Sequence, residues 1–261
     1  MNTNIKITFL IFFTTVSLIA QDFQGIATYK TQRKLDIEID STQVGGMQDE
    51  IMAMLKKQFE KTYILTFNKE ESLYKEDESL APPAKGGVMV FVSDSGSGIL
   101  YKNVKEQRYV KQTDFLGKEF LIQDSLNTLG WQLQSETKNI GTYTCFKATL
   151  EREVESDDNG TKKTQMVTAW YTPQIPVSNG PEEFQGLPGL ILELSYGSQT
   201  ILCSKILLNP EKQIKIKEPT NGDVVSQSEY DAIMIKKIKE MEFQNQGRAD
   251  DDHVIKLKIG G

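Results

Sequence analysis

The strongest constraint on the fold is a series of short runs in which apolar and polar residues alternate. In residues 63–68, Tyr63, Leu65 and Phe67 fall on one face of an extended chain, because side chains alternate across a strand. Residues 25–31 alternate in the same way. Further strand-like runs, separated by turn residues, occupy residues 88–92, 99–102, 108–111, 118–123, 130–134 and 143–154. This pattern predicts a largely antiparallel sheet.

Two segments carry the period of a helix instead. Residues 46–60 place their apolar side chains near one helical face, and residues 228–242 begin with Ser228 as a candidate N-cap. Both helices need an apolar surface to cover. We therefore predict an α+β fold that is mainly β with two helices. It would be a curved antiparallel sheet or half-barrel, covered by the helices, with a Pro/Gly-rich excursion late in the chain.

A hairpin is predicted over residues 151–165. Asn159-Gly160 suits a type I′ turn, and acidic residues before the turn face Lys162 and Lys163 after it.

The excursion runs from residue 172 to residue 189. Four prolines, Pro173, Pro176, Pro181 and Pro188, exclude a central strand there. The flanking residues 164–171 and 190–196 both have strand character, so we expect them in the same sheet. Residues 180–184 suit one helical turn with Pro181 at its first position.

A sharp turn leads from the excursion into a buried strand. Pro188 has the φ that position i+1 of a type II turn requires, and Gly189 is expected to supply the positive φ at position i+2. Leu190 and Ile191 then begin an apolar run without alternation, as in a strand covered on both faces. The structural motif Gly186-Leu187-Pro188-Gly189-Leu190-Ile191 contains no nucleophile, acid, base or metal ligand.

This hexapeptide and its upstream context resemble the GLPGLI family, a group of exported proteins of Bacteroidota. The resemblance also rests on Trp131 and on the segments 143–148, 169–173 and 184–185, and it covers residues 131–196. It implies a signal peptide and an envelope location. It implies no activity and no catalytic residue, so no site is carried over from it.

Residues 1–20 have the pattern of a secretory signal peptide, with Lys6 before an apolar run and Ala20 before the cleavage point. The alternative is a retained membrane anchor, although the run is short for a membrane span. We expect residues 21–261 to form a single exported β-rich domain without a transmembrane span. Its location would be the periplasm, the outer membrane or the cell exterior. The net charge of −6 argues against nucleic acid as a partner.

Two cysteines, Cys145 and Cys203, lie in strand-like runs, and an exported protein can form a disulfide between them. Two buried free thiols are an equally supported alternative. With His253 as the single histidine, the chain has too few Cys and His ligands for a four-ligand zinc site. We predict no metal site and no cofactor.

The sequence contains no recognised catalytic pattern: it lacks a Gly-x-Ser-x-Gly elbow, a His-Glu-x-x-His helix and a phosphate-binding loop. We expect a non-enzymatic envelope protein that binds an apolar ligand or a partner peptide in a sheet concavity. The predicted lining residues are Trp170, Tyr171, Phe184 and Leu187. The alternative is an envelope copper-handling protein that uses Met47, Met52 and Met54, which would otherwise be core residues. An unrecognised hydrolase is the hypothesis that the residue inventory disfavours most.

Overall fold

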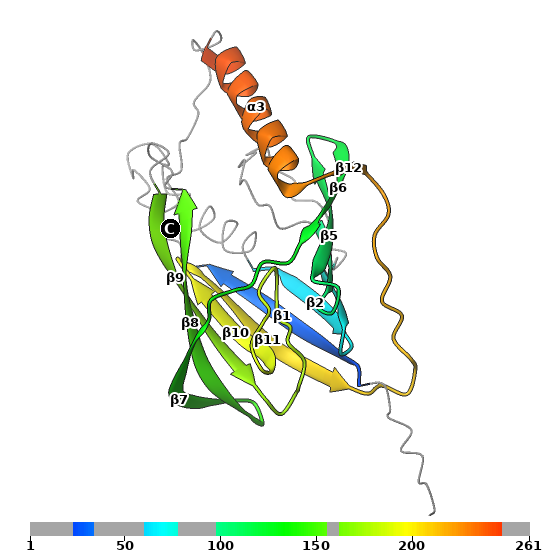
Figure 1. Ribbon diagram of the computed structural model, residues 1–261, viewed down its shortest axis with the longest axis vertical. Helices are drawn as coiled ribbons and strands as arrows, with labels where there is room; N and C mark the ends of the chain where they lie inside the picture. Colours follow the sequence, from blue (N-terminus) through cyan, green and yellow to red (C-terminus); the bar gives the residue numbers. More distant parts are fainter. Residues whose placement is uncertain (1–22, 34–59, 78–97, 156–161, 247–261) are drawn as a thin grey trace, which may run out of the picture.

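The computed structural model describes residues 23–33, 60–77, 98–155 and 162–246 (Figure 1). Within these ranges, twelve strands form one sheet and one helix lies near its edge. The elements are β1 (Gly25–Arg33), β2 (Thr62–Phe67), β3 (Glu71–Glu76), β4 (Gly98–Asn103), β5 (Arg108–Phe115), β6 (Lys118–Ser125), β7 (Gln132–Ile140), β8 (Tyr143–Glu155), β9 (Lys162–Thr172), β10 (Leu190–Tyr196), β11 (Gln199–Leu208), β12 (Asp223–Val225) and α3 (Gln227–Gln246).

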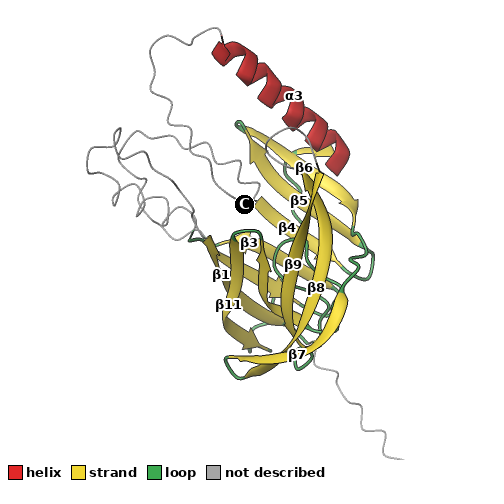
Figure 2. Ribbon diagram, turned by 90° about the vertical axis from the view of Figure 1, so that its left-hand side faces the viewer, coloured by secondary structure: helices red, strands yellow, loops and turns green. Residues whose placement is uncertain are grey.

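The sheet is open and strongly curved (Figure 2). Its strand order is β12-β6-β5-β4-β3-β2-β1-β11-β10-β9-β8-β7. Neighbours pair antiparallel except β12, which lies parallel to β6. The prediction that the strands before and after the excursion share one sheet is confirmed, since β9 and β10 are direct neighbours. The expected hairpin partners are confirmed as well, with Glu155 opposite Lys162.

The predicted α+β class, with helices over the sheet, is wrong: the described chain is nearly all β. The helix expected over residues 228–242 exists as α3, but it meets the sheet only near β6 and then projects beyond it (Figure 1). Irregular segments cover the sheet where helices were expected. The other predicted helix, the strand at 88–92 and the leader at 1–20 lie outside the described residues.

The concave face holds the main core. Odd-numbered residues of β1 and β2 point inward, because side chains alternate across a strand, and Tyr29, Leu65 and Phe67 are fully buried there. The excursion supplies the opposing surface, with Ile175, Phe184 and Leu187 in the same apolar cluster. The excursion therefore fills this part of the concave face.

The convex face is covered near β4 to β6 by the segment between β11 and β12. Ile216 packs there against a cluster of Tyr101, Val110 and Leu121. Arg108 of β5 anchors the segment through a two-fold contact with Glu218, at 2.8 and 3.0 Å. This crossing carries the chain from the middle of the sheet to its edge.

Helix α3 begins with a capping box rather than with the expected Ser228 cap. The Ser226 hydroxyl accepts from the Glu229 amide at 3.3 Å, and the Glu229 carboxylate accepts from the Ser226 amide at 2.8 Å. Tyr230 then packs on Phe120 of β6, with ring centroids 5.3 Å apart. No helix in the described ranges has both the length and the apolarity needed to cross a membrane.

Candidate functional site

The excursion is held by tight turns centred on its prolines. Val177 donates to the carbonyl of Ile175 across Pro176, and Gly189 donates to the carbonyl of Leu187 across Pro188, both at 2.8 Å. Bonds that skip one residue define γ-turns, and the φ of proline suits the central position of the inverse form. The prolines therefore shape the excursion.

The expected type II turn at Pro188 and Gly189 is wrong in its details. Gly189 has no positive φ, and the positive value of 94° belongs to Gly186 instead. Gly189 is required for a different reason, since a Cβ there would lie 2.5 Å from the carbonyl carbon of Thr172 and 2.8 Å from the nitrogen of Pro173. The start of β10 approaches the end of β9 too closely for any side chain.

The four predicted lining residues do not share one environment. Phe184 and Leu187 are each 1% exposed, and Tyr171 lies in the same buried cluster. Trp170 alternates to the opposite face of β9, where the Lys138 ammonium lies 4.3 Å from its ring centroid. Three of the four therefore contribute to the core, and ligand binding by these residues stays a prediction.

The two cysteines are free thiols in the structure. Cys145 lies in β8 and Cys203 in β11, with β9 and β10 between them in the sheet. Burial raises the pKa of Cys145 to about 11 and that of Cys203 to about 12. The thiols are therefore held in their unreactive protonated form.

The described ranges contain no group of three or more His, Cys, Asp or Glu residues that could hold a metal ion. The methionines of the copper hypothesis, Met47, Met52 and Met54, and the single histidine, His253, lie outside these ranges. The copper hypothesis therefore stays a prediction.

A buried lysine joins the excursion to the sheet. Lys102 of β4 points into the concave face and is fully buried. Its ammonium donates to the main-chain carbonyls of Gly180, Glu182 and Phe184 at 2.9, 2.7 and 3.4 Å. Burial lowers the pKa of Lys102 to about 7, against the opposing charges of Glu183 and Glu182. The three carbonyls use all three ammonium protons, and this favours the charged form.

The three carbonyls belong to the segment that was expected to form a helical turn. It is instead a β-turn in which Phe184 donates to the carbonyl of Pro181 at 3.2 Å. Glu182 has a φ of 51°, a left-handed conformation that is uncommon for a residue with a Cβ. This conformation stores strain on the order of 1–2 kcal/mol, which the surrounding contacts must offset.

The Glu182 side chain is half-buried between polar partners. Its carboxylate accepts from the Tyr196 hydroxyl at 2.6 Å and from the Gln199 amide at 3.3 Å. Burial raises the pKa of Glu182 to about 7, and the charge of Glu183 adds to the shift. The Tyr196 hydrogen bond and the charges of Arg152 and Lys111 oppose the shift only in part. Glu182 can therefore gain or lose a proton near neutral pH.

Arg152 of β8 closes over this turn. Its guanidinium pairs with Glu183 at 3.0 Å and lies 4.7 Å above the Tyr196 ring and 5.3 Å above the Phe184 ring. Its Nε also donates to Gln165 of β9 at 3.0 Å. We define the Glu182 cluster as Arg152, Glu182, Glu183, Tyr196 and Gln199.

Sequence reasoning missed this cluster. In the sequence, Lys102 has the pattern of an ordinary polar strand residue. Glu182 and Glu183 have the pattern of exposed surface acids beside Pro181. The available signal was the concentration of proline and glycine in the excursion, which indicated an ordered path but not its partners. The cluster forms because three distant parts of the chain, β4, β8 and β10–β11, meet around residues 180–184.

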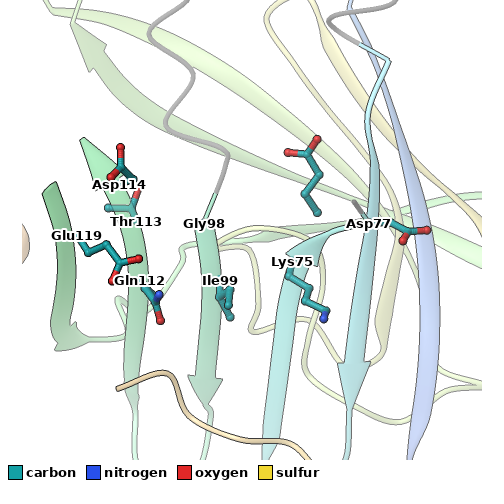
Figure 3. A pocket seen from close by; sticks show the side chains of 9 residues that line it. Lys75, Asp77, Gly98, Ile99, Gln112, Thr113, Asp114 and Glu119 are labelled. Atoms are coloured by element: carbon teal, nitrogen blue, oxygen red, sulfur yellow. The ribbon is translucent and has the colours of Figure 1, made fainter. Parts of the chain in front are cut away.

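A separate cavity of about 620 Å³ opens where β3 and β4 diverge (Figure 3). The pairing of these strands ends at Tyr74 and Leu100. The lining is mostly polar and acidic: Lys75, Glu76, Asp77, Gly98, Ile99, Gln112, Thr113, Asp114 and Glu119. Both strands lead from this point into residues outside the described ranges.

The comparisons with known proteins give a partial match to a family of unknown function and a likeness of fold. Residues 131–162 and 151–193 match the family described as "Protein of unknown function (Porph_ging)". This match is consistent with the expected resemblance to an uncharacterised family. Membership in the GLPGLI family stays a prediction. No curated protein matches the sequence.

Two solved structures of PNGF-II, in the P21 and C2 space groups, resemble the chain with a TM-score of 0.50 and 15% sequence identity. Each alignment covers 82% of this chain and 33% of the PNGF-II chain. The chain therefore spans about a third of the length of these structures, and at this identity the likeness concerns the fold alone.

Proposed function

We propose that this chain is an exported, non-enzymatic binding protein of the cell envelope whose ligand contacts the Glu182 cluster. The leader-like residues 1–20 and the family resemblance support export. The binding role rests on the cluster, because the excursion already fills the apolar part of the concave face. We therefore still place the ligand on the concave face, but it contacts polar side chains there instead of the apolar ones that the sequence predicted.

The single observation that carries this proposal is the conformation of Glu182. The residue is strained at φ 51°, its carboxylate is half-buried, and its main-chain carbonyl is fixed by Lys102. Glycine would make the same turn without strain, and strained residues of this kind cluster at functional sites. Perturbed acids held in this way are frequent at binding and catalytic sites.

A polar ligand fits this surface better than an apolar one. Tyr196, Gln199, Arg152 and Glu183 all present hydrogen-bonding groups around Glu182. Phe184, which was expected to line an apolar surface, lies 1% exposed beneath Arg152. Displacing Arg152 to reach this ring would break its ion pair with Glu183.

The test uses the full chain, expressed with its leader in the cells that encode it and recovered from their envelope. We expect native mass spectrometry to find a bound species on the wild type and on a Glu106→Gln control, and not on Glu182→Gln. N-terminal sequencing should begin at Gln21. Glu106 is a suitable control because it is exposed and its carboxylate pairs locally with Arg108.

Two outcomes would overturn the proposal. One is that the chain recovered from the envelope carries no bound species in the wild type or in either variant. The other is a bound species that Glu182→Gln retains while thermal melting shows both variants folded. Recovery of the chain from the cytoplasm with Met1 intact would remove the export part.

A further inference from the structure

The ladder between β3 and β4 stops before either strand ends. Its last pair is Tyr74 with Leu100, although β3 continues to Glu76 and β4 begins at Gly98. By the register of the preceding pairs, Glu76 would lie opposite Gly98. The sheet is therefore open between two neighbouring strands of its interior, where the cavity of about 620 Å³ lies (Figure 3).

Each of the two strands is held away from this gap by its outer neighbour. On one side, the Asp77 amide donates to the carbonyl of Thr62, at the start of β2, at 2.8 Å. On the other side, β4 lies so close to β5 that a Cβ on Gly98 would clash with the carbonyl oxygen of Gln112. The gap is therefore a fixed part of the fold.

The gap exposes an open strand edge. Main-chain groups of consecutive residues in a strand point to opposite sides. Because the Asp77 amide faces β2, the amide and carbonyl of Glu76 face the gap, where Gly98 would otherwise be their partner. An open edge of this kind accepts the main chain of another extended segment, which adds a strand to the sheet. The cavity volume also falls within the range of about 300–1,000 Å³ that is typical of ligand sites.

The lining of the gap selects the charge of that segment. Four carboxylates lie there against one ammonium, that of Lys75. The carboxylates belong to Glu76, Asp77, Asp114 and Glu119. Among the described residues, only Glu76 of these acids has an ion-pair partner, the Lys61 ammonium at 3.3 Å. Asp114 and Glu119 are exposed and directly opposite each other on β5 and β6, an arrangement in which like charges destabilise a sheet. A basic ligand would relieve this repulsion.

The spacing of the carboxylates suits a ligand with several cationic groups better than a single metal ion. The described ranges contain no group of three or more His, Cys, Asp or Glu residues that could hold a metal, so these acids are spread around the gap. Figure 3 shows Asp77 on one side of it and Asp114 with Glu119 on the other. Lysine or arginine side chains along an extended peptide match such a distribution.

We propose that the gap between β3 and β4 binds an extended, basic segment of a partner protein. The main chain of that segment pairs with the open edge at Glu76, and its Lys or Arg side chains lie beside Asp77, Asp114 and Glu119. A polyamine would satisfy the charges, but it has no carbonyl to accept from the Glu76 amide. The inference uses no residue of the Glu182 cluster, so it goes beyond the proposed function and does not depend on it.

The first test is an NMR titration of the full chain, isotopically labelled, in low-salt buffer, because salt screens exposed charges. The probe is a short, end-capped peptide that alternates lysine with threonine. One control is the same peptide methylated at every main-chain nitrogen, and the other replaces lysine by glutamate. We expect the probe to shift the amides of Glu76 and Gly98, and both controls to bind about tenfold more weakly or not at all.

Two changes in the lining should move the affinity in opposite directions. Asp114→Asn with Glu119→Gln removes the facing carboxylates, so we expect about tenfold weaker binding. The melting temperature of this double variant should be unchanged or higher, because a repulsion is removed. Lys75→Gln removes the opposing ammonium and should tighten binding, which a misfolded protein would not do. Glu153→Gln, at an exposed acid of the β8–β9 hairpin, is the matched control and should leave the affinity unchanged.

Several outcomes would overturn the inference. One is that the lysine-threonine peptide does not bind, either because the gap stays empty or because residues 78–97 of this chain occupy it. Another is that main-chain methylation leaves the affinity unchanged, or that spermine binds as tightly as the peptide, since charge alone would then explain binding. Amide shifts that map away from Glu76 and Gly98 would overturn it as well.

Discussion

The Lys102 ammonium donates a 2.7 Å hydrogen bond to the main-chain carbonyl of Glu182. Glu182 is thereby held at both ends, since its carboxylate accepts from Tyr196 on the other side of the turn. This double attachment explains how a glutamate keeps a left-handed conformation in the turn at residues 181–184. It also joins β4 to β10, two strands that have four other strands between them in the sheet order.

Replacing Lys102 by methionine should destabilise the fold strongly. The change leaves three buried carbonyls without their donor, and we expect a loss of roughly 3 kcal/mol or more in the free energy of unfolding. Urea denaturation measures this loss. Lys105→Met is the control, because Lys105 is exposed and its replacement should change stability by less than about 0.5 kcal/mol. A Lys102→Met protein as stable as the control would show that the lysine does not anchor the excursion.

Glu182 should make stability fall as pH rises from about 4.5 through 7. Its pKa is raised from 4.5 to about 7, so the folded state holds this proton more tightly than the unfolded state does. The stabilisation is complete below pH 4.5 and is lost as the folded group ionises, with a magnitude on the order of 2–3 kcal/mol. Glu182→Gln cannot ionise and should lose this dependence.

Lys102 does not disturb this measurement. Its pKa is lowered to about 7, so below pH 7 it is charged in both states and contributes no slope. Between pH 7 and 10.5 Lys102 makes stability rise with pH, which is opposite to the effect of Glu182. The reason is that the folded state releases the Lys102 proton at a lower pH than the unfolded state does. Urea titrations of wild type and Glu182→Gln between pH 4.5 and 7 therefore isolate the glutamate. A constant difference across that range would contradict the raised pKa.

Two glycines of the hexapeptide should respond differently to alanine. Gly189→Ala places a Cβ against the backbone of Thr172 and Pro173, which cannot move aside, and should cost more than about 2 kcal/mol. Gly186→Ala places its Cβ at ordinary contact distance from the Trp131 ring, 3.8 Å, and suffers only from its φ of 94°, at about 1 kcal/mol. Gly130→Ala, with neither problem, is the control. If thermal unfolding showed a larger loss of stability for Gly186→Ala than for Gly189→Ala, this assignment would be disproved.

Cys145 and Cys203 should not react with a thiol reagent in the folded protein. Both are buried, and burial raises the pKa of the Cys145 thiol to about 11 and that of the Cys203 thiol to about 12. We expect two free thiols to titrate in denaturant without reductant. Finding none under those conditions would mean that the cysteines pair.

Local patterns predicted much of the β structure correctly. Alternation placed Tyr63, Leu65 and Phe67 on one face, and all three are buried as members of β2. The charge pattern of the hairpin predicted the pairing of β8 with β9, where Lys162 lies 3.0 Å from Glu153. Such signals lie within a few residues of each other, so the sequence alone displays them.

Other features depend on residues that meet only in the folded chain. The helix prediction at 228–242 was right because its period is local, but the covering role assigned to it was wrong, since residues 173–189 and the segment around Ile216 had already occupied the two faces. The positive φ moved from Gly189 to Gly186 because the Leu187–Gly189 hydrogen bond forms a γ-turn across Pro188.

Local patterns predicted most of the strands, the helix α3 and an ordered, proline-shaped path between β9 and β10, because hydrophobic periodicity and the fixed φ of proline act locally. They did not predict β3 or β12. Long-range packing instead decided that the Lys102 ammonium would bind three carbonyls some eighty residues away and that Glu182 would be strained and half-buried. Desolvation and close approach depend on which distant segments meet, and sheet curvature sets that arrangement in this protein.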